Sequence, residues 1–169
     1  SGLKTSHTLK PDFSWGCSNI DKLISKYNLS DYILLFPFCS EHLEQKRWPY
    51  YDQLIKLIKQ NHPNLKIAIA PGPGEIEKAK ELDAISILSE DKAISISELA
   101  GLIKRSKFVV ANDTGPAHMA AHLNVKGLTL FGSHTTAHKV SIERENFKAI
   151  QVSDLKNLSA EKVFERLVF

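Results

Sequence analysis

The segment from Asn112 to His118 combines residue types that suit the binding of a diphosphate. Gly115 allows a ligand to approach the backbone closely, and Pro116 fits the first turn of a helix, where a backbone N–H would lack a partner. We expect the following N–H groups, on residues 117–119, to point out of the helix start and bind an anion, to which His118 also donates. An ordinary strand-to-helix turn explains the pattern equally well.

Asp113 requires a different role within the same segment. Two anions at contact distance repel each other, so Asp113 is not expected to bind phosphate directly. We interpret Asp113 as a residue that orders the amides of the loop or accepts hydrogen bonds from sugar hydroxyls.

Three other loops carry residues that could bind the same ligand. Gly132 begins a loop rich in serine and threonine, whose amides and hydroxyls could hold the other end of a diphosphate. Glu75 or Glu77 could accept hydrogen bonds from ribose, although complementing a helix dipole is the commoner use of such a carboxylate. Lys46 could neutralise phosphate charge without a metal. Each of these patterns also occurs in plain turns and on exposed charged surfaces.

Histidine pairs at helical spacing raise the question of a zinc site. His118 and His122 lie one helical turn apart, and His134 and His138 repeat the spacing. The pattern lacks the intervening Glu of H-E-x-x-H and a third ligand at a motif spacing. We therefore predict no metal site and no cofactor.

Strand and helix patterns alternate along the chain and predict where these loops lie. The predicted fold class is α/β, a Rossmann-like open parallel sheet with helices on both faces. Ligands bind such sheets at the carboxyl ends of the strands, where all four loops are expected. The expected strands are 32–36, 66–70, 84–88, 108–112, 127–131 and 147–152, and the expected helices are 20–27, 49–60, 75–82, 96–103, 116–123 and 160–167, with capping residues at Ser95 and Ser159.

Length and composition suit one globular domain. The 169 residues are 43% hydrophobic and 24% charged, which excludes disordered, collagen-like and coiled-coil classes. We interpret residues 1–17 as a linker or lead-in and residues 18–169 as the domain. The formal net charge is only +3, with both signs interleaved, which argues against a nucleic-acid partner. No apolar run approaches the roughly 20 residues of a transmembrane helix.

Four motifs of the sequence occur together in one known family. They are Lys46-Arg47-Trp48-Pro49, Gly72-Pro73-Gly74-Glu75, Ser97-Glu98-Leu99-Ala100, and above all Asp113-Thr114-Gly115-Pro116-Ala117-His118 with Leu130-Phe131-Gly132. With these motifs, the chain from about Ile33 to Ser141 resembles the C-terminal, donor-binding half of the ADP-heptose:lipopolysaccharide heptosyltransferases, glycosyltransferase family 9.

The resemblance implies one half of a two-domain type-B glycosyltransferase fold, in which two Rossmann-like halves face each other across a cleft. It implies inverting transfer of heptose from ADP-heptose to the lipopolysaccharide inner core of a Gram-negative bacterium. Lys46 would contact donor phosphate, Glu75 the ribose, and Asp113 the sugar. Lys46 and His118 would stabilise the leaving group. The donor-binding residues implied are Lys46, Glu75, Asp113, Thr114, Gly115, Pro116, His118 and Gly132.

The resemblance also implies what this sequence does not contain. The family's catalytic base is an aspartate early in the N-terminal half, which also binds the acceptor. We therefore expect these 169 residues to bind an ADP-sugar without turning it over. The family's enzymes are cytoplasmic and act at the inner face of the inner membrane, which implies peripheral membrane association.

Two other functions remain open from the residues alone. One is a different nucleotide-sugar enzyme of the same shape, either another sugar transferase or an epimerase. The segment Ser133-His134-Thr135 stands where the family usually has Pro-Thr-Asp, which leaves the sugar undecided. The other is a non-catalytic nucleotide-binding module.

Overall fold

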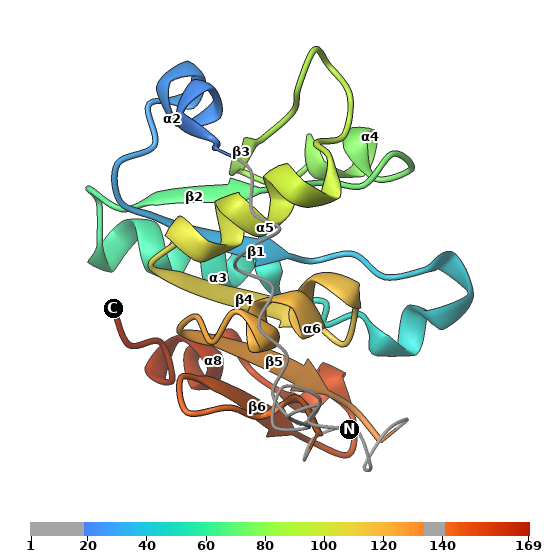
Figure 1. Cartoon of the computed structure of the whole chain (residues 1–169). Coiled ribbons are helices and arrows are strands. Elements are labelled where there is room, and N and C mark those ends of the chain that lie inside the picture. Colours follow the sequence, from blue (N-terminus) through green and yellow to red (C-terminus); the bar gives the residue numbers. More distant parts are fainter. Residues whose placement is uncertain (1–18, 134–140) are drawn as a thin grey trace, which may run out of the picture.

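The computed structural model describes residues 19–133 and 141–169, and its centre is a six-stranded parallel sheet (Figure 1). The strand order is β3-β2-β1-β4-β5-β6, so the direction of the chain across the sheet reverses between β1 and β4. This confirms the predicted α/β, Rossmann-like open sheet. The strands are β1 (Tyr32–Phe36), β2 (Lys66–Ile69), β3 (Ile85–Ser86), β4 (Phe108–Asn112), β5 (Gly127–Phe131) and β6 (Phe147–Gln151).

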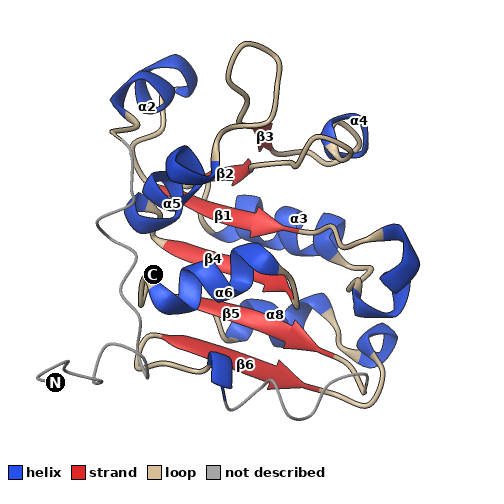
Figure 2. Ribbon diagram, turned by 45° about the vertical axis from the view of Figure 1, so that its right-hand side comes forward, coloured by secondary structure: helices blue, strands red, loops and turns tan. Residues whose placement is uncertain are grey.

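Helices cover both faces of the sheet, as predicted. Figure 2 shows α5 and α6 on one face and α3 and α8 on the other. The helices are α2 (Asp21–Tyr27), α3 (Tyr51–Asn61), α4 (Ile76–Ala79), α5 (Ile96–Arg105), α6 (Gly115–His122) and α8 (Ala160–Glu165), with short 3-10 helices η2 (Glu41–Lys46) and η3 (Leu155–Asn157).

Two apolar layers, one on each face, hold the sheet between its helices. Every residue of β1, β4 and β5 is buried, as expected for strands covered on both sides. Leu34 packs in the layer that contains α5 and α6, whereas Ile33 and Leu35 pack in the layer that contains α3 and α8. The sheet is therefore a rigid support for the loops at its carboxyl edge.

Two predicted caps are present, and both fix the start of a helix. In α5, Glu98 N donates to Ser95 Oγ and Ser95 N donates to Glu98 Oε1, each across 3.1 Å, which completes the capping box. In α8, Lys162 N donates to Ser159 Oγ across 3.3 Å. Local sequence therefore sets the N-terminal ends of these two helices.

Several predicted bounds differ from the structure by one to three residues, and three differences have an evident cause in the backbone. Helix α3 begins at Tyr51 and not at Pro49, because Tyr50 has a non-helical backbone. The helix predicted over 75–82 is the single turn α4, because the amides of Glu81 and Leu82 bond to carbonyls three residues back and tighten the chain into a turn. Strand β3 is two residues long and not five. Its partner β2 ends at Ile69, two residues before Pro71, and Pro71 has no N–H to donate.

Gly127, at the start of β5, lies too close to its neighbours to carry a side chain. A Cβ built on Gly127 would lie 2.6 Å from Cε2 of Phe147 and 2.9 Å from the carbonyl oxygen of Val109. The tight packing of β5 between β4 and β6 therefore depends on a glycine at this position.

Among residues 19–133 and 141–169, no helix has the length and apolar character needed to cross a membrane.

Candidate nucleotide-binding site

Asp113 lies directly after β4 and contacts a lysine and a histidine from two other elements. Nζ of Lys46, the last residue of η2, lies 3.2 Å from Oδ2 of Asp113, and Nε2 of His118 lies 3.6 Å from Oδ1. The Asp113 side chain is 6% exposed, whereas those of Lys46 and His118 are 21% and 40% exposed. The carboxylate is therefore covered, while its two partners remain accessible to a ligand.

The environment of Asp113 favours its charged form. Hydrogen bonding with His118, and then with Lys46, lowers the pKa of Asp113 well below its usual value, although burial acts in the opposite direction. Asp113 is therefore ionised at neutral pH. It holds an ammonium group and an imidazole beside the start of α6.

The start of α6 differs in one respect from the prediction. The amides of Ala117 and His118, which were expected to be free, both donate to the carbonyl oxygen of Thr114, across 3.1 and 3.3 Å. The hydroxyl of Thr114 donates to the carbonyl oxygen of Asn112 across 3.3 Å and does not cap the helix. Within the described part of the chain, the backbone N–H groups of Thr114 and Gly115 have no partner. These two groups, at the positive end of the helix dipole, are the donors left for an anion.

Gly115 leaves open space above this helix start. A Cβ built on Gly115 meets no atom within 4 Å, and no described glycine has a left-handed backbone conformation. Neither the backbone nor packing against residues 19–133 and 141–169 therefore requires glycine at this position. The space that a side chain would fill is available to a ligand.

A cavity of about 540 Å³ adjoins the start of α6 and contains several predicted site residues. Glu75, Thr114 and Pro116 line it. Oε2 of Glu75 accepts a hydrogen bond from Gly72 N across 2.8 Å, which holds the carboxylate at the cavity wall. The apolar part of the lining comes from the ends of β1 and β2 and from the start of α5, and includes Phe36, Ile69, Ile94, Ile96 and Leu99. A flat ring system with a polar edge suits such a lining.

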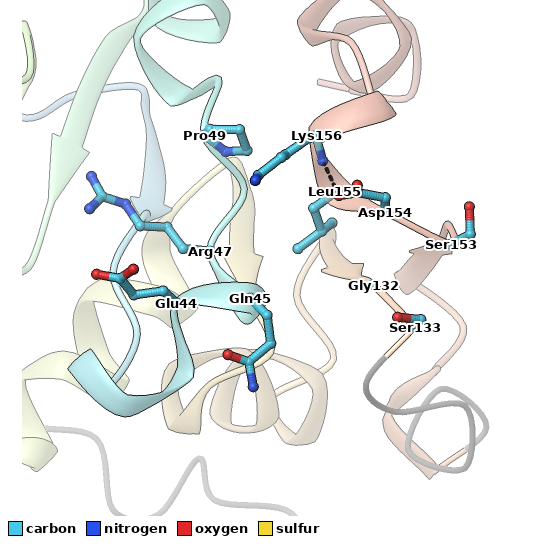
Figure 3. A pocket seen from close by; sticks show the side chains of 10 residues that line it. All are labelled: Glu44, Gln45, Arg47, Pro49, Gly132, Ser133, Ser153, Asp154, Leu155 and Lys156. Carbon is cyan, nitrogen blue, oxygen red and sulfur yellow. Dashed lines mark hydrogen bonds between the residues drawn. The ribbon is translucent and has the colours of Figure 1, made fainter.

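The structure does not bring Gly132 into this cavity. Gly132 lines a second hollow of about 720 Å³, together with residues after β6 and around the end of η2 (Figure 3). The segment that carries Lys46, residues 39–49, borders both spaces. Cys39 and Ser40 line the cavity, and Gln45 and Pro49 line the hollow. Seven of the eight predicted residues therefore divide into the Asp113 cluster, the cavity wall and the second hollow, and the eighth, Gly115, begins α6 between the cluster and the cavity wall.

Asn112 is a site residue for which the sequence pattern predicts no role of its own. The residue is fully buried, and its Oδ1 accepts hydrogen bonds from Trp48 N across 3.2 Å and from the Tyr51 hydroxyl across 3.3 Å. Burial raises the pKa of Tyr51 well above its usual value, so this hydroxyl stays protonated and donates. Asn112 therefore ties the segment that follows Lys46 to the end of β4. An amide side chain at the end of a buried strand was the available signal.

No group of three His, Cys, Asp or Glu side chains that could hold a metal ion occurs among the described residues. Burial, and then the charge of Arg144, lowers the pKa of His122. His134 and His138 lie outside the described residues.

Sequence comparison finds one family across nearly the whole chain. The model of the family described as "Glycosyltransferase family 9 (heptosyltransferase)" matches residues 4–167. Lipopolysaccharide heptosyltransferase 1 of Campylobacter coli is 32% identical over 114 residues, which cover 62% of this chain and 33% of that protein. The enzyme of the same name from Escherichia coli K12 is 27% identical over 129 residues, 73% of this chain and 40% of that protein. The chain thus spans only about a third of the first of these relatives.

Solved structures with the same fold include both heptosyltransferases and epimerases. E. coli heptosyltransferase WaaC with ADP has a TM-score of 0.67 at 24% identity, over 83% of this chain and 45% of that one. E. coli ADP-heptose lps heptosyltransferase II has a TM-score of 0.70 at 19% identity, over 97% and 51%. UDP-GlcNAc 2-epimerase from Methanocaldococcus jannaschii, in complex with UDP-GlcNAc and UDP, has a TM-score of 0.61 at 17% identity, over 94% and 43%. At these identities the likeness shows the fold alone.

Proposed function

The chain belongs to glycosyltransferase family 9, and from this membership we propose that it is the donor-binding half of an enzyme that transfers heptose from ADP-heptose to the lipopolysaccharide inner core with inversion. One observation carries the proposal. Lys46, Asp113 and His118 come together beside the start of α6, where the space over Gly115 is open.

The diphosphate would lie over the start of α6. The N–H groups of Thr114 and Gly115 would donate to it, the Lys46 ammonium and His118 Nε2 would flank it, and the helix dipole would favour its charge. Because Asp113 already holds the lysine and the imidazole, little side-chain entropy is lost when the ligand binds.

The nucleoside would enter the 540 Å³ cavity, where Glu75 accepts hydrogen bonds from ribose hydroxyls. Oε2 of Glu75 already accepts from Gly72, which leaves Oε1 for the sugar of the nucleotide. The apolar lining would pack against the base. A relative solved with ADP supports the choice of nucleotide.

In the transfer step, ADP leaves with the electron pair of the glycosidic bond. Lys46, His118 and the helix dipole would stabilise the charge that develops on the leaving phosphate. Inversion also requires a base on the opposite face of the sugar, to take the proton of the acceptor hydroxyl. The two carboxylates of the site are already engaged, Asp113 with Lys46 and His118, and Glu75 with Gly72.

We therefore assign the base and most of the acceptor site to a further Rossmann-like half. This chain covers about half the length of its structural neighbours. In this proposal residues 18–169 form the donor domain and residues 1–17 lead into it. The chain alone binds the donor without transferring heptose, and the complete enzyme works in the cytoplasm at the inner membrane surface.

Calorimetry with ADP, UDP and GDP tests the proposal. We expect ADP to bind most tightly, and Lys46→Ala and His118→Ala each to weaken ADP binding by about 1 to 3 kcal/mol through a lost charge-assisted hydrogen bond. Lys104→Ala, an exposed lysine of α5, is the control. A clear preference for UDP would favour an epimerase-like function, and unchanged ADP binding in both variants would favour a structural role for these loops. Heptosyl transfer by this chain alone would contradict the assignment of the base.

A further inference from the structure

The second hollow has a volume of about 720 Å³ and is not needed for the nucleotide. It lies at the carboxyl ends of β5 and β6, and it is bordered by the end of η2 and by η3 (Figure 3). Its volume falls within the roughly 300–1,000 Å³ typical of small-molecule sites. Because the segment that carries Lys46 borders this hollow too, a ligand there would lie beside the reacting groups.

Hydrogen bonds within the chain hold the walls of the hollow in place. Nε1 of Trp48 donates to the carbonyl oxygen of Leu158, and the Tyr50 hydroxyl donates to that of Lys156, each across 2.7 Å. Nε2 of Gln151 donates to the carbonyl oxygen of Gly132 across 3.2 Å. The backbone around η2, β5 and η3 is therefore fixed before any ligand arrives. A preformed site binds with a smaller loss of entropy.

The side chains of the hollow offer donors and acceptors without an excess of either charge. Four charged side chains line it, the cationic Arg47 and Lys156 and the anionic Glu44 and Asp154 (Figure 3). The two positive and two negative charges balance, so the hollow does not match a second polyanion.

Hydroxyl and amide groups of the hollow are available to a ligand. In the described ranges, the side chains of Gln45, Ser133 and Lys156 make no hydrogen bond or ion pair. An amide, a hydroxyl and an ammonium at separate points around one hollow can each form a hydrogen bond with a ligand that carries several hydroxyl groups (Figure 3). Pro49, which is exposed at the rim, adds an apolar surface for the C–H face of a ring.

We propose that this hollow binds a sugar unit of the acceptor. This inference rests on the proposed function and extends it, because it gives this half of the enzyme a part in acceptor recognition. The transferred sugar is joined to the diphosphate and must lie at Lys46 and Asp113. A second sugar in the hollow would approach the reacting carbon from the side away from the nucleoside cavity.

Amide NMR spectra of the ¹⁵N-labelled chain saturated with ADP test the inference. The probe is the deacylated inner-core oligosaccharide of a heptose-deficient lipopolysaccharide. We expect saturable shifts of the amides of Gly132, Ser133 and Lys156. If the oligosaccharide shifts only other amides, or none, the inference is overturned. The proposed function is tested separately in the same sample, by the shifts that ADP causes at the amides of Gly115 and His118.

Variants and a second titration separate the alternatives. The double variant Gln45→Ala/Lys156→Met should lower the affinity for the oligosaccharide roughly tenfold, the loss expected for one or two hydrogen bonds. Its ADP affinity and melting temperature should not change, and Lys104→Met is the control. An unchanged oligosaccharide affinity overturns the inference. Titration with ADP-heptose alone identifies the source of the sugar: saturating shifts of the same three amides assign the hollow to the transferred sugar and overturn its assignment to the acceptor.

Discussion

The backbone N–H of Trp48 donates a hydrogen bond to Oδ1 of Asn112 across 3.2 Å, which joins the segment after Lys46 to the strand that ends beside Asp113. The Tyr51 hydroxyl donates to the same oxygen across 3.3 Å. One buried amide thus holds two distant parts of the sequence at the spacing at which Lys46 reaches Asp113.

Asn112→Ala should lower the free energy of unfolding by about 1 to 3 kcal/mol, because it leaves the Trp48 amide buried without an acceptor. It should also weaken ADP binding, because Lys46 loses its fixed position. Urea unfolding and calorimetry measure the two effects. Tyr51→Phe keeps the hydrogen bond from Trp48 to Asn112, so it should reduce ADP affinity less than Asn112→Ala does.

A double-mutant cycle shows whether Asn112 acts through Lys46. In the Lys46→Ala background, Asn112→Ala should cause no further loss of ADP affinity. If Asn112→Ala caused the same loss of ADP affinity with and without Lys46, this would show that Asn112 acts through general stability.

Gly115→Ala should weaken ligand binding without destabilising the fold. The added methyl group meets no atom of the described residues within 4 Å, so the midpoint of urea unfolding should stay the same or rise slightly. ADP affinity should fall roughly tenfold, because the methyl group occupies the space over the helix start. The control is Gly74→Ala, which also adds a methyl group in open space, at a residue that does not line the 540 Å³ cavity. Equal ADP affinity for Gly115→Ala and the native chain would show that the diphosphate does not bind at this position.

Gly127→Ala should have the opposite effects. Its Cβ would lie 2.6 Å from Phe147 and 2.9 Å from a backbone oxygen, so β5 and β6 must shift apart. We expect a loss of about 1 to 3 kcal/mol in the free energy of unfolding, as for other overpacked cores. Under conditions where the variant stays folded, its ADP affinity should match that of the native chain. A variant as stable as the native chain would show that Phe147 can move aside freely.

The stability of the chain should depend on pH through Asp113. Its pKa is lowered in the folded state, so the unfolded chain binds more protons in acid. The stabilisation by Asp113 is therefore present above its ordinary pKa of 3.8 and is lost as the pH falls toward the lowered value.

Urea unfolding between neutral and acidic pH, for the native chain and Asp113→Asn, measures this dependence. The difference in stability between the two should be largest near neutral pH and should narrow in acid. Asp31→Asn, which removes an exposed partner of Lys107, is the control and should show little difference at any pH. If the difference in the free energy of unfolding between the native chain and Asp113→Asn did not change with pH, this would contradict the role of ionised Asp113.

The fold could be predicted because its signals are local. The continuous apolar runs of β1 and β4 and the Ser95–Glu98 capping box depend on neighbours within a few residues. The length of the segment predicted over 75–82 was wrong, because the turn after Ala79 is tightened by backbone bonds three residues apart, which the helical pattern does not show.

The candidate site could be predicted only in part, because its contacts join distant residues. The motif around Gly115 indicated an anion site, and the structure places Lys46 and His118 beside it. The roles of Asn112 and Trp48 depend on a bond between residues 64 positions apart, which no local pattern reveals. The position of Gly132 in a separate hollow likewise depends on how η2 and η3 pack against the sheet.

The reversal of strand order between β1 and β4 also affects how the chain reaches its native state. Lys46 follows β1 and Asp113 follows β4, 67 residues later. An intermediate in which only the first three strands have assembled would contain Lys46 and Glu75 but not the α6 start. Binding of ADP during refolding should therefore appear only after β4 has docked against β1. A nucleotide that is present from the start of refolding would thus bind when the sheet is complete, and not when its first strands form.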